Sequence, residues 1–321
     1  MKRPFYTKLA VLALLMLPLT GLRAQHPFEL GDLAKLTSLS DPQFSSDGKT
    51  IAVVFSRPDY EENRSQTGLL LVTAANGQQR VLAERRAGLT QPRWSPNGQE
   101  LAYLERTGTG KEAAPQLFVR ALAGGKPRQL TRTRKGVQHY AWQPDGSALA
   151  FVTADEPKNE AGPPEKGYDA FEVGDNDLFL TAAPTSSHIW LVPAAGGEAR
   201  RLTSGAWSLL VTIPPGAPSS PLSWRPDGKF LAFVQVPLPH SGNSNQRTVQ
   251  LLNVADGTIR PLTSRKSLEG YPSFSPDGTQ VAYWYPRQGN TVNINEAWVA
   301  PATGGEGRSS LGTKPAGFVF L

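Results

Sequence analysis

A short sequence motif that recurs five times limits the fold of this 321-residue chain more than any other feature. Each copy has an aromatic residue, two linking residues, Asp or Asn, and Gly; in four copies the residue before Asp or Asn is proline. The copies are Phe44–Gly48, Trp94–Gly98, Trp142–Gly146, Trp224–Gly228 and Phe274–Gly278. Proline presets φ for a turn, and glycine takes the left-handed conformation that closes it. The motif therefore predicts five hairpins, each with an aromatic anchor on the incoming strand. Its repeat positions have a structural role, chiefly Trp94, Gly98, Trp142, Gly146, Trp224, Gly228, Phe274 and Gly278.

A second hairpin follows each first one. An apolar run leads into an Asn-Gly, Asp-Gly or Gly-Gly turn, and a closing strand follows, which in three copies ends in Leu-Thr. Each unit therefore has four short antiparallel strands, and such units at a period of about fifty residues are typical of β-propeller blades. We expect an all-β propeller rather than a β-sandwich, which has no fixed period. The expected blades lie near residues 40–85, 90–132, 138–204, 220–264 and 270–312.

One interval between units is longer than the others. Successive turn glycines are 50, 48, 82 and 50 residues apart. The extra residues fall at two places, 155–186 between the second and third strands of the third unit, and 204–221 in the connection to the fourth unit. In an up-and-down sheet both connections leave from the same end. We therefore expect the two insertions to rise side by side from one face.

The N-terminus has the pattern of a secretory signal. Basic residues precede an apolar stretch over Leu9–Leu19, and Leu22-Arg-Ala24 resembles a cleavage site. The stretch is too short to span a bilayer. We expect a signal peptide over 1–24, a propeller domain over 25–321, no membrane anchor, and a periplasmic or secreted protein. Without residues 1–24 the chain keeps 29 of its 33 basic residues, against 27 acidic ones. A net charge so close to zero gives no electrostatic argument for binding to nucleic acid. The chain has no cysteine, so the core must hold it together without disulfides.

The sequence contains no catalytic constellation. Gly-x-Ser-x-Gly is absent. The four histidines, His26, His139, His188 and His240, are expected in loops or at strand edges without repeated partners. Catalytic residues, cofactors and metals are therefore not predicted; Asp175-Asn-Asp177 suggests calcium, but the rest of an oxygen-ligand loop is missing.

Carboxylates are the candidate binding groups. The first insertion is acidic, and we select Glu172, Asp175 and Asp177 because apolar neighbours would anchor them. They would receive a cationic partner such as a peptide N-terminus, or they form a solvated loop. Glu61 and Glu62, between the second and third strands of the first unit, form a second pair on the same face, or an exposed turn.

The repeats resemble two groups of propellers, TolB-like periplasmic proteins and the N-terminal propeller of prolyl oligopeptidase (S9) family serine peptidases. The decorated third unit, Asp169–Asp177 and Pro184–Pro193 with Arg201–Ser208, and the opening Asp32–Phe44, look like exported bacterial S9 peptidases. That resemblance implies a propeller that filters access to a C-terminal α/β-hydrolase domain with a Ser, Asp and His triad.

The chain itself departs from that arrangement, because it has no serine motif. A sixth anchor aromatic would fall at about residue 322, just past Leu321, so we expect an incomplete ring truncated before a C-terminal domain. Two hypotheses follow. In the first, the chain is a non-catalytic propeller that gates and orients peptide substrates for a hydrolase domain. In the second, it is a TolB-like periplasmic scaffold for protein partners.

Overall fold

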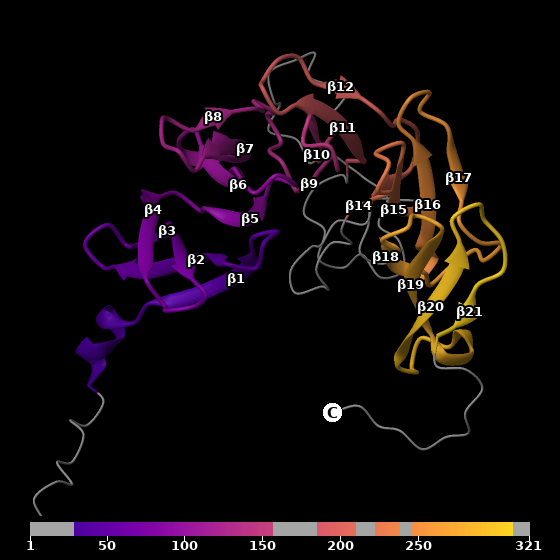
Figure 1. Ribbon diagram of the computed structural model, residues 1–321, viewed down its shortest axis with the longest axis horizontal. Coiled ribbons are helices and arrows are strands. Elements are labelled where there is room, and N and C mark those ends of the chain that lie inside the picture. The colour runs from indigo at the N-terminus through magenta and orange to yellow at the C-terminus, as the bar shows by residue number, and fades with distance from the viewer. Residues whose placement is uncertain (1–28, 157–184, 210–221, 238–244, 311–321) are drawn as a thin grey trace, which may run out of the picture.

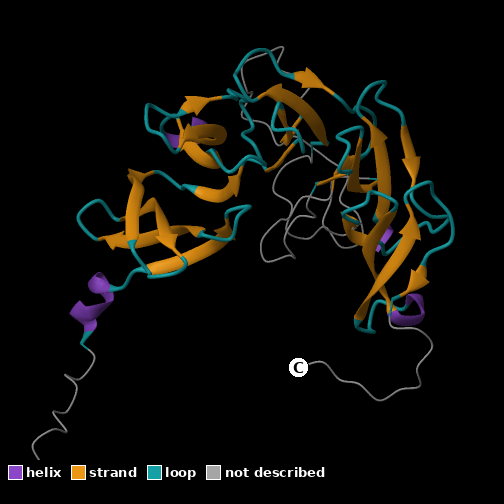
Figure 2. Ribbon diagram, viewed as in Figure 1, coloured by secondary structure: helices purple, strands orange, loops and turns teal. Residues whose placement is uncertain are grey.

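The computed structural model describes residues 29–156, 185–209, 222–237 and 245–310. In these ranges the chain forms five antiparallel sheets, one from each sequence repeat, which follow one another along an open arc (Figure 1). Apart from short 3-10 turns the described secondary structure is all strand (Figure 2). The predicted fold class, an all-β propeller of four-stranded blades with an incomplete ring, is confirmed.

The sheets are numbered one to five in chain order. Sheet one contains β1 (Ser38–Phe44), β2 (Thr50–Asp59), β3 (Arg64–Thr73) and β4 (Gln79–Arg86). Sheet two contains β5 (Thr90–Trp94), β6 (Glu100–Thr107), β7 (Ala114–Ala121) and β8 (Arg128–Gln129). Sheet three contains β9 (His139–Trp142), β10 (Ala148–Ala154), β11 (Ser187–Pro193) and β12 (Arg200–Arg201). Sheet four contains β13 (Ser208–Leu209), β14 (Ser223–Trp224), β15 (Phe230–Val236), β16 (Thr248–Asn253) and β17 (Ile259–Pro261). Sheet five contains β18 (Gly270–Phe274), β19 (Gln280–Pro286), β20 (Asn295–Pro301) and β21 (Arg308–Ser309). The 3-10 turns are η3 (Leu30–Lys35), η4 (Gly110–Glu112) and η6 (Arg287–Gly289).

The recurring motif forms the turn between the first two strands of each sheet. In sheet two the Gly98 amide donates to the Ser95 carbonyl (2.8 Å), with Gly98 at a φ of +69°. The Asn97 side-chain oxygen accepts from the Ser95 hydroxyl (2.7 Å) and the Gln99 amide (3.0 Å). The polar groups of the turn are therefore satisfied by hydrogen bonds within the turn itself, which explains why Asn or Asp stands before the glycine.

The anchor tryptophans join sheets two, three and four to the sheet that precedes each of them. Each indole N–H donates to a main-chain carbonyl on the first strand of the sheet before it. The pairs are Trp94 to Gln43 (2.9 Å), Trp142 to Arg93 (3.2 Å) and Trp224 to Ala141 (3.4 Å). Phe44 in sheet one has no preceding sheet among the described residues, and 64% of it is exposed.

Arginines join each sheet to the following one. One arginine stands at the same register of every closing strand, and three of them donate to a carbonyl of the next sheet. The pairs are Arg128 to Ala194 (3.2 Å), Arg200 to Val254 (3.1 Å) and Arg260 to Ala302 (2.6 Å). Neighbouring sheets are therefore linked by a backward indole bond or a forward guanidinium bond, or by both.

A change of Trp94 to Phe tests the backward bond. We expect the free energy of unfolding to fall by about 1 kcal/mol, because an aromatic ring stays at the position while the hydrogen bond from the indole to the Gln43 carbonyl is lost. Urea denaturation measures this. Trp284→Phe is the matched control, since Trp284 is 48% exposed on sheet five and should change stability by less than about 0.5 kcal/mol. Equal losses in the two variants would contradict the role of the bond.

The core is a series of apolar layers between neighbouring sheets. On β15, Leu231 and Phe233 pack in the layer shared with sheet three, whereas Ala232 and Val234 pack in the layer shared with sheet five. Because both faces of an inner strand are covered, its sequence is a continuous apolar run instead of an alternating one. This arrangement accounts for the apolar run that follows each turn motif.

The second insertion differs from its expected place. Both β13 and β14 pair with β15, with Ser208 opposite Val236 and Trp224 opposite Leu231. Residues 210–221 therefore interrupt the first strand of sheet four; they do not lengthen the connection before it, and the described part of sheet four begins at Ser208 instead of near 220. Sheets one, two and five have a β-bulge at this place in their first strand. A bulge already breaks the ladder there, so an insertion disrupts few further hydrogen bonds.

Candidate functional site

The first insertion begins and ends next to the point where the second insertion begins. The described residues at their bases are Asp155, Ser187 and Ser208, with His188 and Arg201 beside them, and we name these five residues the insertion face. The Ser187 amide, at the end of the first insertion, donates to the Ser208 hydroxyl at the start of the second (2.9 Å). The bases of the two insertions are thus adjacent, across sheets three and four (Figure 1).

A buried histidine lies under this face. His188 is fully buried, and its Nε2 lies 3.7 Å from the Asp155 carboxylate. The same carboxylate pairs with Arg201 Nη2 at 2.9 Å. Burial lowers the pKa of His188, with Asp155 opposing that shift. The imidazole is therefore neutral near pH 7 and inaccessible to a substrate.

The arrangement is not a catalytic triad. The Ser208 hydroxyl donates to the Leu209 carbonyl (3.0 Å) and accepts from Ser187. Among the described residues His188 Nε2 has no hydrogen-bond partner, so no serine is activated by it. The expectation that His188 lies in a loop or at a strand edge is wrong, because it occupies β11 and packs against Trp207 (ring centroids 4.8 Å apart).

The closing Leu-Thr pairs explain why a polar side chain is buried here. The Thr203 hydroxyl accepts from the Ile189 amide (2.9 Å), and the Thr131 hydroxyl accepts from the Leu117 amide in the same way (2.9 Å). In sheet two Thr131 also donates to Gln116, which stands where His188 stands in sheet three. His188 is therefore one version of a repeated structural network.

The first strands of sheets one to three carry a second polar cluster. Arg93 Nη1 lies 3.0 Å from both carboxylate oxygens of Asp41, which joins β5 to β1. His139 on β9 lies near this pair, and burial with the charge of Arg93 lowers the pKa of His139 to about 4. His139 is the first residue of β9, the edge strand of sheet three, which agrees with its expected place at a strand edge.

His139 should make stability depend on pH. Its folded pKa of about 4 lies below the ordinary value of 6.5, so the fold favours the neutral ring. Stability is complete above pH 6.5 and is lost as the pH falls toward 4. We expect the free energy of unfolding to fall by about 2 kcal/mol more in the native chain than in His139→Gln between pH 7.0 and 4.5, measured by urea denaturation. Parallel curves for the two proteins would contradict this assignment.

The carboxylates selected from the sequence are only partly placed. Glu61 and Glu62 lie in the exposed turn between β2 and β3, where Glu62 is 3.7 Å from Arg64. The Glu62 amide donates to Asp59 (3.1 Å). Contact of this pair with a partner stays a prediction. Glu172, Asp175 and Asp177 lie outside the described residues.

Within the described ranges, no three acidic, histidine or cysteine side chains gather as metal ligands would. In the same part of the chain, no helix is both long and apolar enough to cross a bilayer.

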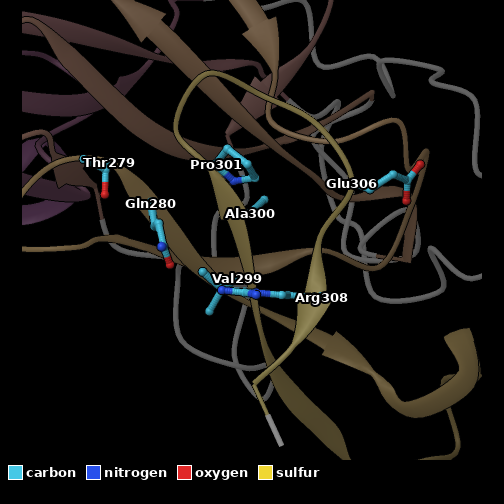
Figure 3. A pocket seen from close by; sticks show the side chains of 7 residues that line it. All are labelled: Thr279, Gln280, Val299, Ala300, Pro301, Glu306 and Arg308. Carbon is cyan, nitrogen blue, oxygen red and sulfur yellow. The ribbon is translucent and has the colours of Figure 1, made fainter. Parts of the chain in front are cut away.

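A hollow of about 370 Å³ lies on sheet five. Figure 3 shows Val299 and Arg308 side by side in it, and they pair across β20 and β21. Arg308 occupies the register of Arg128, Arg200 and Arg260, whose side chains reach the next sheet. The hollow is therefore the uncovered face of the last described sheet, where no following sheet is described.

Comparisons with known proteins agree with this geometry. No family model matches the chain. It is 26% identical over 256 residues to the uncharacterized peptidase YuxL of Bacillus subtilis, covering 78% of this chain and 30% of that protein.

Solved structures with this fold include an acylaminoacyl peptidase of Pyrococcus horikoshii (TM-score 0.60, 15% identity, 87% of this chain and 40% of that one). The propeller domain of the Pyrococcus furiosus trilobed protease has a TM-score of 0.54 at 17% identity, covering 87% of this chain and 72% of that one. A putative TolB of Agrobacterium tumefaciens has a TM-score of 0.51 at 16% identity, covering 85% and 80%.

The chain thus spans about a third of the length of its curated relative. The likeness to solved structures shows the propeller fold, and the relative in sequence is a peptidase. The predicted resemblance is confirmed: this chain is a β-propeller domain similar to those of S9-type peptidases and TolB-like proteins.

Proposed function

We propose that this chain is the non-catalytic propeller of an exported S9-type serine peptidase, and that it gates and orients peptide substrates for an α/β-hydrolase domain. The observation that carries the proposal is the placement of the insertions. Their bases are joined by the bond from Ser187 to Ser208, on one face of an otherwise regular arc. Loops clustered on a rigid scaffold are where proteins commonly place binding residues.

The sequence relationship supports a peptidase in preference to another propeller protein, because YuxL is a peptidase and aligns with 78% of this chain. Export is supported by the signal-peptide pattern over residues 1–24. The hydrolase domain would supply the catalytic serine, aspartate and histidine, since this sequence has no Gly-x-Ser-x-Gly motif.

The coding sequence after codon 321 tests the assignment of the parent protein. We expect it to encode a Gly-x-Ser-x-Gly motif followed by Asp and His, and we expect the native protein in a periplasmic or secreted fraction to react with a fluorophosphonate probe. A stop codon with no such motif downstream, together with an unlabelled protein, would refute the peptidase assignment. A partner retained in a periplasmic pull-down would then favour the TolB-like scaffold.

The acidic insertion is proposed to receive the peptide amine. The variant Glu172→Gln with Asp175→Asn and Asp177→Asn should bind tetra-alanine amide, which has a free amine, at least tenfold more weakly than the native chain. Glu61→Gln with Glu62→Gln is the comparison on the first sheet, and it tests whether that pair contributes. Calorimetric titration measures both. Unchanged affinity in the triple variant would exclude these three residues from the site.

A further inference from the structure

One position departs from the pattern of the five sheets. The third strand of each sheet has a residue opposite the centre of the second strand, and in four sheets it is large and apolar. These residues are Leu70, Phe118, Trp190 and Trp298. In sheet four the residue is Gln250, opposite the fully buried Phe233.

The departure leaves a polar hollow at the insertion side of sheet four. Its volume is about 480 Å³, within the range of small-ligand sites. Trp207 stacks on Phe233 (ring centroids 5.6 Å apart) and forms the apolar wall. Gln235, Gln246 and Gln250 line the hollow, with Thr248 between them.

The amides in the hollow have free hydrogen-bonding capacity. Gln250 donates to the Thr248 hydroxyl (3.0 Å), which leaves its carbonyl oxygen available. The side chains of Gln235 and Gln246 make no hydrogen bond to any described residue. A primary amide offers a donor and an acceptor in one plane, as a peptide group does, so these side chains are suited to pair with a peptide main chain.

The charges at the rim are all positive. Lys266 and Arg265 are the charged residues among the described ones that line the hollow. Arg265 Cζ lies 4.0 Å from the ring centroid of Tyr285 and 4.6 Å from that of Trp298, and these cation–π contacts hold its guanidinium in place. Its buried Nε has no hydrogen-bond partner in the described structure. A fixed guanidinium beside an ammonium favours a carboxylate.

We propose that this hollow is a subsite for the C-terminal carboxylate of a short peptide, with the glutamine amides binding the main chain and Arg265 and Lys266 binding the carboxylate. The proposal rests on the proposed peptide-handling function and names a ligand group for it.

The test uses N-acetyl-tetra-alanine with a free carboxylate and the same peptide as its C-terminal amide, titrated into the full chain by calorimetry. The acetyl group removes the amine, so any contribution of the acidic insertion is absent. We expect the acid to bind at least tenfold more tightly than the amide. Lys266→Glu should remove this preference, while Lys126→Glu, an exposed charge change on sheet two, should keep it.

A second variant fills the hollow. Gln250→Leu introduces the residue type that Leu70 supplies in sheet one, so the fold should be retained, and thermal unfolding checks this. Binding of the acid should be lost, while Gln79→Leu, an exposed change on β4, should leave it unchanged.

Three outcomes decide between the proposals. A preference for the acid that depends on Lys266 and Gln250 supports the subsite. Equal binding of acid and amide overturns the subsite but leaves peptide handling standing. No binding of either peptide, nor of tetra-alanine amide, overturns both.

Discussion

Replacing Gly68 with alanine should destabilise the chain by about 3 kcal/mol. Gly68 lies on β3, where an added Cβ would overlap the Phe55 ring and lie 2.5 Å from the Ala83 carbonyl oxygen. Phe55 is only 8% exposed and is confined by the sheet, so the backbone must shift. Urea denaturation measures the loss.

Gly31→Ala is the matched control for that change. Gly31 lies in η3, and an added Cβ there meets nothing within 4 Å. We expect its stability to change by less than about 0.5 kcal/mol. If the two variants unfold at the same urea concentration, close packing at Gly68 does not limit the first sheet.

Phe233→Ala should have a larger effect, a loss of about 4 kcal/mol. The ring is fully buried between sheets three and four and stacks on Trp207. Its removal leaves a cavity that the paired strands around it cannot close. Phe44→Ala, at an anchor position that is 64% exposed, should cost less than about 1 kcal/mol.

The two phenylalanines are compared by thermal and urea unfolding. Because the chain has seven tryptophans, the fluorescence of Trp207 is taken as the difference between each protein and its Trp207→Phe form. We expect its emission to shift to longer wavelength in Phe233→Ala, because the indole loses its apolar neighbour. An unshifted spectrum with native stability would show that the core between sheets three and four does not depend on this ring.

The repeating parts of the fold could be predicted because local chemistry determines them. The turn motif encodes a closed hairpin in adjacent residues, as Ser95, Asn97 and Gly98 illustrate. The number and order of the sheets follow from the number of such motifs and their positions in the sequence. The exposed turn at Glu61 and Glu62 could be read in the same way.

The strand that the second insertion interrupts cannot be predicted, because a two-residue strand has no sequence pattern. Ser208 and Leu209 belong to sheet four only through their pairing with Val236 and Gln235, which lie about 27 residues away along the chain. A bulge likewise depends on the partner strand. Spacing along the chain located the extra residues but not the strand that they interrupt.

The polar features near the insertions also depend on distant contacts. His188 is buried because Trp207 and Thr203 cover it, and neither is its neighbour in sequence. The hollow at Gln250 could have been found by aligning the third strands, where glutamine replaces Leu or an aromatic residue. That signal was present, but its meaning requires the register with Phe233.

The bonds between sheets give the arc a direction. A tryptophan always donates backward and an arginine always donates forward, so the two outer faces of the series differ: one presents Phe44 and the other Arg308. Twofold symmetric pairing of two molecules needs identical surfaces, and a forward face cannot match another forward face by these bonds. Any contact of this type between two copies would therefore be front to back.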